Sequence, residues 1–251
     1  MPADVRFLLC LPTYDERENL PAMVAALAEV RERMPIRGDV LVIDDSSPDG
    51  TGEVADALAA ERPWLHVLHR PAKQGLGRAY RDGFRWALAG DYAYVLEMDC
   101  DFSHDPRDLP RLLEAALAGA DLVLGSRYTA GGGVRDWSLG RRIVSRGGCL
   151  YAQALLGVGV RDLTGGFKCF RRAVLEAIDL DAVDAHGYMF QIEMTYRALR
   201  LGFRVVEVPI TFGDRTRGGS KMSRAIVLEA VRRVPALRAA ALLGRLPRGA
   251  A

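Results

Sequence analysis

The stretch DVLVIDDSSPDGT, residues 39–51, decides the fold. Its apolar run at residues 40–43 is typical of a strand buried on both faces, as a parallel sheet requires. The polar residues that follow are typical of a turn, and a helical pattern begins at residue 52. A buried strand that leads through a turn into a helix is the repeating unit of a parallel α/β sheet.

The same unit recurs on both sides of this stretch. Strands are predicted at residues 6–11, 66–69, 92–98 and 121–126, and helices at 20–33, 52–61 and 77–89. Asn19 is the expected cap of the first helix, and Asp105 with Pro106 opens a further helix that reaches about residue 118. The fold class is therefore α/β, with a mostly parallel sheet flanked by helices.

The regular alternation of strands and helices ends after residue 126. A glycine-rich loop is predicted at 129–135, helices at 141–156, 173–178 and 189–201, and strands at 165–170 and 204–210. A polar loop at 213–221 leads into a basic amphipathic helix at 222–243, which we expect Pro235 to interrupt. We predict one domain over residues 1–221 and a C-terminal helix or tail over 222–251.

Composition excludes several classes of protein. The 251 residues are 49% hydrophobic and 26% charged, which excludes disordered and collagen-like chains. The net charge of +2 gives no reason to expect nucleic acid as a partner, although residues 201–251 carry 10 basic and 3 acidic side chains. The 4 cysteines form no CxxC pair, and the chain shows neither a signal peptide nor 18 consecutive apolar residues. We therefore expect a cytoplasmic location and no membrane span.

Carboxylates follow several of the predicted strands. Asp44 and Asp45 follow the second strand, and Asp99 and Asp101 follow the fourth. Ligands of open α/β sheets bind outside the carboxyl ends of the strands, where these side chains should meet. Crowded carboxylates repel one another unless a cation lies among them, and Mg²⁺ or Mn²⁺ suits one or two carboxylates completed by water and substrate phosphates. Taken alone, Asp99 and Asp101 are more typical of helix-capping residues in a surface turn, but Asp44 and Asp45 on the neighbouring strand favour the metal site.

At these positions the chain resembles the polyprenol-phosphate (dolichol-phosphate) mannosyltransferases, which are inverting family 2 glycosyltransferases with the Rossmann-like GT-A fold. The resemblance covers residues 5–225. It is carried by LPTYDERENL from residue 11, VIDDSSPDGT from 42, GLGRAY from 75, EMDCDFSHDP from 97, LGSRY from 124, TGGFKCF from 164 and GGSKM from 218.

The resemblance implies a role for each matching position. A nucleotide pocket would be formed by Pro12, Tyr14, Glu16, Ile43 and Asp45, with Tyr14 over the base and Asp45 accepting hydrogen bonds from base or ribose. Asp99 and Asp101 would hold Mg²⁺ or Mn²⁺ on the donor diphosphate, with Ser103 as a further ligand and Cys100 contributing backbone only.

Basic residues would meet the two anionic substrates. Arg127 and Arg141 would grip the acceptor phosphate, and Arg215 and Lys221 would close over the diphosphate. Asp101 and Arg127 are the residues that we expect to be catalytic. Taken alone, any one of these arginines is more typical of a solvated surface than of a site, except Arg127, which directly follows a buried strand; Arg142 is an alternative to Arg141.

The implied reaction is transfer of mannose from GDP-mannose to a polyprenyl monophosphate. An acceptor phosphate is mostly dianionic at neutral pH, so no side chain need remove a proton before it attacks. Two alternatives stay open: the same machinery with UDP-glucose or another UDP-sugar, and a non-catalytic module that binds a nucleotide-sugar. A nucleotidyltransferase would instead carry a glycine-rich motif directly after the first strand, where Pro12 to Glu16 stand.

The basic C-terminal helix suggests a membrane surface as a partner. Apolar residues recur at helical spacing from Ile226 to Leu242, and the basic residues that complement them are Arg224, Arg232, Arg233, Arg238 and Arg245. A basic amphipathic helix can lie in the interface of a membrane with anionic lipids, although it can also pack on its own domain. Some members of the family rely on a membrane-spanning partner protein. We therefore expect peripheral association with the cytoplasmic face of a membrane, either direct or through such a partner.

Overall fold

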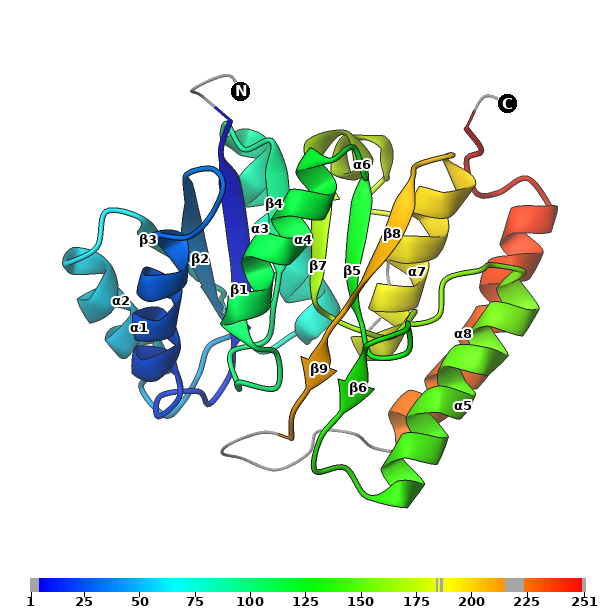
Figure 1. The fold of residues 1–251 in the computed structure, drawn as a ribbon, viewed down its shortest axis with the longest axis horizontal. Helices are drawn as coiled ribbons and strands as arrows, with labels where there is room; N and C mark the ends of the chain where they lie inside the picture. Colours follow the sequence, from blue (N-terminus) through cyan, green and yellow to red (C-terminus); the bar gives the residue numbers. More distant parts are fainter. Residues whose placement is uncertain (1–4, 184, 186, 215–223, 250–251) are drawn as a thin grey trace.

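The computed structural model describes residues 5–183, 185, 187–214 and 224–249, with the backbone alone described at 224–228 and 230. A seven-stranded sheet runs through the molecule in the order β3-β2-β1-β4-β7-β5-β8 (Figure 1). Its strands are β1 (Phe7–Thr13), β2 (Gly38–Asp44), β3 (Leu65–His69), β4 (Tyr94–Glu97), β5 (Leu122–Ser126), β7 (Lys168–Arg171) and β8 (Val205–Pro209). A two-stranded sheet joins β6 (Gly133–Val134) to β9 (Thr211–Phe212).

Strand direction brings the ends of distant segments together. All pairings in the large sheet are parallel except those of β7, which runs antiparallel between β4 and β5. The last residues of β1, β2, β4, β5 and β8 therefore meet at one edge, which we call the carboxyl edge. Because β7 is reversed, its first residue, Lys168, lies at this edge too, opposite Glu97 and Leu124 in register.

Helices cover both faces of the sheet. One face carries α1 (Leu20–Arg31), α2 (Thr51–Ala60) and α4 (Leu109–Leu117), and the short 3₁₀ helix η1 (Pro106–Asp108) precedes α4. The other face carries α3 (Leu76–Ala89), α5 (Leu139–Leu156), α6 (Arg172–Ala177), α7 (Gly187–Arg200) and α8 (Arg224–Leu242). The structure thus confirms the predicted α/β fold, in which helices flank a mostly parallel sheet.

β1 is apolar along most of its length because both of its faces are covered. Along β1, Leu8 and Cys10 join the core beneath α3 and α7, while Phe7, Leu9 and Leu11 join the core beneath α1 and α4. This alternation is the two-residue period of a strand, with apolar partners on both sides.

Close packing of α3 on the sheet depends on a glycine. A Cβ atom at Gly83 would lie 2.5 Å from Cδ1 of Ile43 and 3.0 Å from Sγ of Cys10. The absence of a side chain at Gly83 therefore lets α3 lie closer to β1 and β2 than a larger residue would allow.

Pro235 does not interrupt the C-terminal helix, so that prediction was wrong. Proline lacks the N–H that would bond the carbonyl of Val231, four residues earlier. The hydroxyl of Tyr151, on α5, donates a hydrogen bond of 2.8 Å to this carbonyl. The helix runs from Arg224 to Leu242 because its neighbour supplies the missing donor. α5 and α8 lie side by side at the right of Figure 1.

The expected cap of α1 was also wrong. Asn19 occupies the N-cap position, but its side chain makes no capping hydrogen bond and instead donates to Oε2 of Glu16 at 2.7 Å. Asp105 does cap the next helical segment as predicted, since its carboxylate accepts from the backbone N–H of Arg107. None of the helices in the described ranges is both long and apolar enough to cross a membrane.

Two glycine-to-alanine substitutions should have opposite effects on stability. Gly83→Ala should lower the free energy of unfolding by about 1–3 kcal/mol, because the added methyl group overpacks the contact of α3 with the sheet. Gly147→Ala lies in the exposed part of α5, where an added Cβ meets no described atom within 4 Å. It should raise stability by about 0.5–1 kcal/mol through helix propensity. Urea unfolding followed by circular dichroism measures both; equal effects would contradict the close approach of α3.

Candidate active site

Chain segments that follow five strands converge on the carboxyl edge. Three residues other than glycine have a positive φ just beyond β1, β2 and β4: Asp15 at 55°, Ser46 at 60° and Phe102 at 59°. Such conformations cost of order 1–3 kcal/mol each and cluster at functional sites. This clustering of strain marks the edge as the candidate site, in agreement with the rule for open α/β sheets.

The loops after β1 and β2 form one side of the site. Nζ of Lys73 lies 3.5 Å from the centre of the Tyr14 ring. The buried carboxylate of Asp45 accepts hydrogen bonds from the backbone N–H groups of Gln74 and Gly75, at 3.1–3.2 Å, and pairs with the guanidinium of Arg70. Asp45 thereby ties the end of β2 to the loop before α3.

The other predicted nucleotide residues lie nearby. Pro12 and Ile43 are partners in the β1–β2 register, although the Ile43 side chain is wholly buried in the core. The backbone N–H of Glu16 donates to Thr51 Oγ1 at 3.0 Å, which joins the β1 loop to the start of α2. Asp44 accepts from the backbone N–H of Ser47 and so shapes its own turn.

The turn after β4 brings the two expected metal ligands together. Asp99 and Asp101 both raise the pKa of the buried Tyr80 hydroxyl and of the Cys100 thiol, in each case in addition to the larger effect of burial. The carboxylate of Asp101 accepts the backbone N–H of Ser103 at 3.0 Å. The buried Ser103 hydroxyl has no hydrogen-bond partner among the residues described.

The protein supplies an incomplete set of metal ligands at this turn. Among the described residues, no three side chains of His, Cys, Asp or Glu lie close enough together to hold a metal ion by themselves. Two carboxylates and a hydroxyl suit a cation such as Mg²⁺, which keeps water and binds substrate phosphates.

A buried ion pair lies beneath the turn. Nζ of Lys168 is 3.8 Å from Oε1 of Glu97 and donates to the backbone carbonyl of Gln191 at 2.9 Å; Lys168 and Glu97 are both fully buried. Burial raises the pKa of Glu97 to about 7 although Lys168 opposes the rise, and burial lowers the pKa of Lys168 to about 8 against the opposing effect of Glu97. The pair links β4, which leads to Asp99, with β7 and α7.

Arg127 is held by an acidic residue that the sequence analysis did not single out. Its Nε and Nη2 donate to the two carboxylate oxygens of Asp162 at 2.7 and 2.6 Å, and its backbone N–H donates to the same carboxylate at 2.9 Å. Asp162 is fully buried and Arg127 is 6% exposed. Burial disfavours both charges, but each partner outweighs it: the pKa of Arg127 is raised and that of Asp162 is lowered.

Arginines and aromatic rings form a cluster beside this pair. The guanidinium carbons of Arg127 and Arg141 lie 5.6 and 4.1 Å from the centre of the Trp137 ring. Those of Arg127 and Arg146 lie 5.2 and 4.7 Å from the centre of the Tyr128 ring. We call these five residues the arginine–aromatic cluster. Arg141 also donates to Oδ1 of Asp214 at 2.7 Å.

His104 connects this cluster with the Asp101 turn. Its ring lies between Phe167 and Phe212, at 5.0 and 4.9 Å between centres. Burial lowers its pKa to about 4, with Asp101 opposing the shift and Arg127 adding to it. The imidazole is therefore neutral at physiological pH.

A cleft of about 590 Å³ opens on the α1 and η1 side of the same turn. Its lining includes Phe102, Ser103 and His104, together with Arg33 and Arg135. Tyr14, Asp45 and Asp101 do not line it, so the cleft adjoins the candidate site but does not contain the predicted nucleotide pocket.

The structure brings most of the predicted residues to one edge. Arg215 and Lys221 lie outside the described residues, so their roles stay predictions. Asp162 was missed because it stands two residues before the TGGFKCF motif, where a lone aspartate has no signature of its own. Trp137 and Arg146 were missed because only tertiary contact joins them to Arg127.

Comparison with known proteins places this geometry in a family. The profile of Glycosyl transferase family 2 matches residues 9–179. An undecaprenyl-phosphate mannosyltransferase of Micrococcus luteus is 52% identical over 90% of this chain and 91% of its own length. A polyprenol monophosphomannose synthase of Mycolicibacterium smegmatis is 51% identical over 91% of this chain and 85% of its own.

Solved structures share the fold. A glucosyl-3-phosphoglycerate synthase of Mycobacterium tuberculosis, solved with Mn²⁺, UDP-glucose and phosphoglyceric acid, superposes with a TM-score of 0.69 at 18% identity over 94% of this chain and 81% of its own. The fold is thus GT-A-like. The chain belongs to glycosyltransferase family 2, and within it to the polyprenol-phosphate mannosyltransferases.

Loss of the buried lysine should destabilise the protein far more than loss of an exposed arginine on the same strand. Lys168→Met should lower the free energy of unfolding by about 3–5 kcal/mol, because it leaves Glu97 buried without its cation. Adding Glu97→Leu should recover most of this loss. Arg171, 48% exposed in its pair with Asp121, is the control, and Arg171→Met should cost less than about 1 kcal/mol. Urea unfolding measures all four proteins, and similar losses for the two single variants would contradict the assignment.

Proposed function

We propose that this protein transfers mannose from GDP-mannose to a polyprenyl monophosphate, with inversion at the anomeric carbon, and forms polyprenyl-phosphate β-mannose. The activities for which the two bacterial relatives are named support the sugar and the lipid acceptor. The observation that carries the proposal is the arginine–aromatic cluster, which gathers cations beside the carboxylate turn at one edge of the sheet.

The donor nucleotide would lie over the loops after β1 and β2. The base would lie on the face of the Tyr14 ring and would replace the Lys73 ammonium group, which lies over that ring in the structure. Because Asp45 already accepts from the loop before α3, its contribution would be to fix the shape of that loop as well as to contact base or ribose.

A divalent cation, Mg²⁺ or Mn²⁺, fits the residues after β4. Asp99 and Asp101 would hold it, and the Ser103 hydroxyl, which lacks a partner among the described residues, would be a further ligand. When bound, such an ion neutralises the charge that develops on the leaving nucleoside diphosphate. Arg215 and Lys221 are proposed to help in this, as the family resemblance implies.

The acceptor phosphate would bind at the arginine–aromatic cluster. Arg127 and Arg141 would hold its oxygens, with Trp137 between the two guanidinium groups. One phosphate oxygen attacks the anomeric carbon of mannose, the new C–O bond forms as the bond from that carbon to the diphosphate breaks, and GDP leaves with the electron pair. Positioning and charge neutralisation suffice, because the nucleophile carries no proton to be removed.

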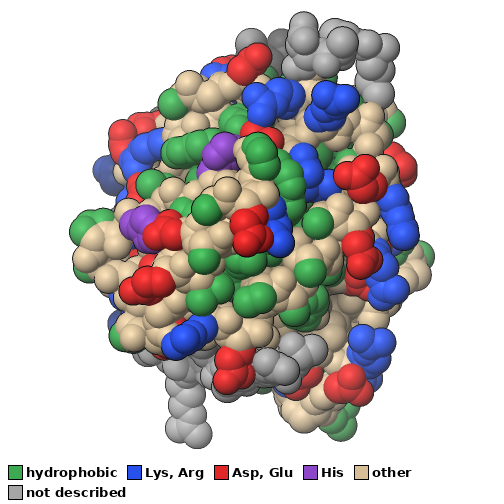
Figure 2. All heavy atoms as spheres, turned by 90° about the vertical axis from the view of Figure 1, so that its left-hand side faces the viewer, with side chains coloured by type: hydrophobic (Ala, Val, Ile, Leu, Met, Phe, Trp, Pro, Cys, Tyr) green, Lys and Arg blue, Asp and Glu red, His purple; other side chains and the backbone are tan. Residues whose placement is uncertain are grey.

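A membrane surface is the proposed source of the lipid acceptor, at its cytoplasmic face. All large hydrophobic side chains that are exposed among the described residues lie on α5, on α8 or just after α8. They include Leu139, Ile143 and Val144, in the same half of α5 as Arg141 and Arg146. At the opposite end of the molecule, around α2 and β3, acidic and basic side chains are interspersed (Figure 2).

We propose α5, in place of α8, as the main contact with the membrane. Val234, Leu237 and Ala241 of α8 are buried in the core, so part of its apolar face packs on the domain. Removal of the tail would therefore expose core residues, and surface substitutions on α5 test membrane binding more cleanly.

Donor competition tests the proposed reaction. With a polyprenyl phosphate as acceptor, labelled mannose from GDP-mannose should appear in the lipid fraction with Mg²⁺ or Mn²⁺ and should disappear with EDTA. Excess unlabelled GDP-mannose should suppress the label, whereas UDP-glucose should not. Transfer from UDP-glucose alone would contradict the mannose donor and favour the alternative UDP-sugar reaction.

The control for this experiment is a variant of the proposed metal site. Asp101→Asn should lower kcat by about 100-fold or more through loss of stabilisation of the leaving group. It should also weaken Mn²⁺ binding, measured by electron paramagnetic resonance. Full turnover in this variant would contradict the proposed role of Asp101.

Membrane binding can be tested on α5 alone. The double variant Ile143→Ser, Val144→Ser should lower partitioning onto phosphatidylglycerol-containing vesicles by about tenfold or more, because two exposed apolar side chains are lost. Sedimentation of vesicles with bound protein measures the effect. The control, Ala57→Ser with Ala60→Ser on the exposed side of α2, should sediment like the unchanged protein. Equal binding by both variants would contradict a contact through α5.

A further inference from the structure

We propose that Asp162 is a positioning residue for the acceptor phosphate, which acts by fixing the Arg127 guanidinium in one orientation. The proposal rests on the function proposed above, in which Arg127 contacts that phosphate. It adds a residue to the site that neither the motifs of the sequence nor the comparisons assign.

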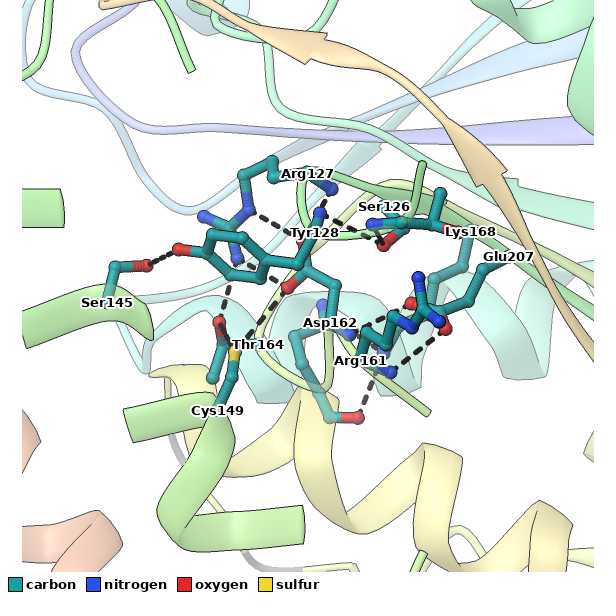
Figure 3. A network of polar contacts seen from close by, with 12 residues as sticks. Ser126, Arg127, Tyr128, Ser145, Cys149, Arg161, Asp162, Thr164, Lys168 and Glu207 are labelled. Carbon is teal, nitrogen blue, oxygen red and sulfur yellow. Dashed lines mark hydrogen bonds and ion pairs between the residues drawn. The ribbon is translucent and has the colours of Figure 1, made fainter. Parts of the chain in front are cut away.

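The geometry of the pair leaves the guanidinium little freedom. Asp162 binds two of its nitrogens, Nε and Nη2, in a fork with N–O distances of 2.7 and 2.6 Å (Figure 3). A bidentate pair of this kind fixes the plane of the guanidinium as well as its position. The same carboxylate accepts the backbone N–H of Arg127, so side chain and main chain are held by one group.

A second acceptor completes the hold. Nη2 also donates to Thr164 Oγ1 at 2.8 Å, and the Cys149 thiol lies 3.3 Å from that hydroxyl. Nη1 of Arg127 makes no hydrogen bond to any residue that the structure describes. The network therefore holds Nε and Nη2 and leaves Nη1 as the donor for an anionic ligand.

The loop that carries Asp162 is itself anchored. Glu207, on β8, accepts the backbone N–H groups of Arg161 and Asp162, both at 2.9 Å (Figure 3). Because β8 pairs with β5 in parallel, and Arg127 directly follows β5, strand pairing sets the distance between the two ends of this network. Asp162 is thus tied to the sheet at two points: through Glu207 to β8, and through the backbone N–H of Arg127 to the end of β5.

The energetics explain why a carboxylate is needed here. Burying a guanidinium without a counter-charge destabilises the folded protein. The bidentate pair with Asp162 offsets this cost, so Arg127 stays charged at a site with little water. If Asp162 were absent, Arg127 would turn toward solvent or other partners, and the acceptor phosphate would meet a misplaced donor. Small misplacements of reacting groups lower rates by about 100-fold.

Steady-state kinetics of the full chain with both substrates tests the proposal. Asp162→Asn should lower kcat/KM for polyprenyl phosphate by about 100-fold, as expected for a misplaced contact. KM for GDP-mannose and the affinity for GDP with Mn²⁺, measured by calorimetry, should stay within about twofold, because Asp162 lies in the acceptor network. Two-dimensional ¹H–¹⁵N spectra of arginine Nε–H groups should show faster solvent exchange for Arg127.

A matched control separates positioning from folding. Asp39 is a buried carboxylate at the opposite edge of the sheet, paired with Arg6 and hydrogen-bonded by the Tyr92 hydroxyl at 2.7 Å. Asp39→Asn should lower the melting temperature without changing kcat/KM for the acceptor. If Asp162→Asn does not fold, Glu207→Gln carries the same test, since it loosens only the anchor of the loop, and a tenfold effect on the acceptor is expected at about the same donor KM.

A double-mutant cycle distinguishes the possible failures. In an Arg127→Ala background, Asp162→Asn should have no further effect on kcat/KM for the acceptor. If Arg127→Ala lowers this value but Asp162→Asn does not, or if the two effects multiply, Asp162 does not act through Arg127 and the inference is overturned while the proposed function stands. If Arg127→Ala leaves acceptor kinetics unchanged, the proposed role of Arg127 fails, and the inference fails with it.

Discussion

The ion pair between Arg127 and Asp162 is the interaction on which the candidate site depends. A guanidinium that is 6% exposed has lost most of its contact with water, and only a counter-charge at hydrogen-bond distance keeps it in place. Arg127 is also the member of the arginine–aromatic cluster that touches both rings, Tyr128 and Trp137. Arg127 therefore shares the Trp137 ring with Arg141 and the Tyr128 ring with Arg146.

The same constraint recurs along the carboxyl edge. Asp45 is paired with Arg70 beside the loops that follow β1 and β2, and Glu97 with Lys168 beneath the Asp101 turn. Each pair joins segments that are distant in the chain, so charge compensation also fastens the loops to one another. The strained residues just beyond β1, β2 and β4 persist because this surrounding structure holds them.

Under the proposed function, α5 would join the acceptor site to the membrane surface from which the lipid comes. Its first half carries Arg141 and Arg146 of the cluster together with the exposed side chains of Ile143 and Val144. Further along the helix, Tyr151 donates to the carbonyl that Pro235 leaves unpaired in α8. A single helix therefore presents cations to the site and apolar side chains to solvent, and it also stabilises the C-terminal helix.

The sequence by itself determined the α/β class, most of the strands and helices, and the carboxylates after β2 and β4, because apolar period and turn residues are local signals. It also placed Arg127 at a strand end. Only the tertiary structure decided that Asp162 holds Arg127, that the guanidinium groups of Arg127 and Arg141 both lie near the Trp137 ring, and that α8 continues through Pro235. Arg127 and Asp162 are 35 positions apart in the chain, and Tyr151 and Val231 are 80 positions apart, so no local pattern encodes which of these residues meet. The sequence thus determines which charges reach the edge, and the fold determines how they are paired.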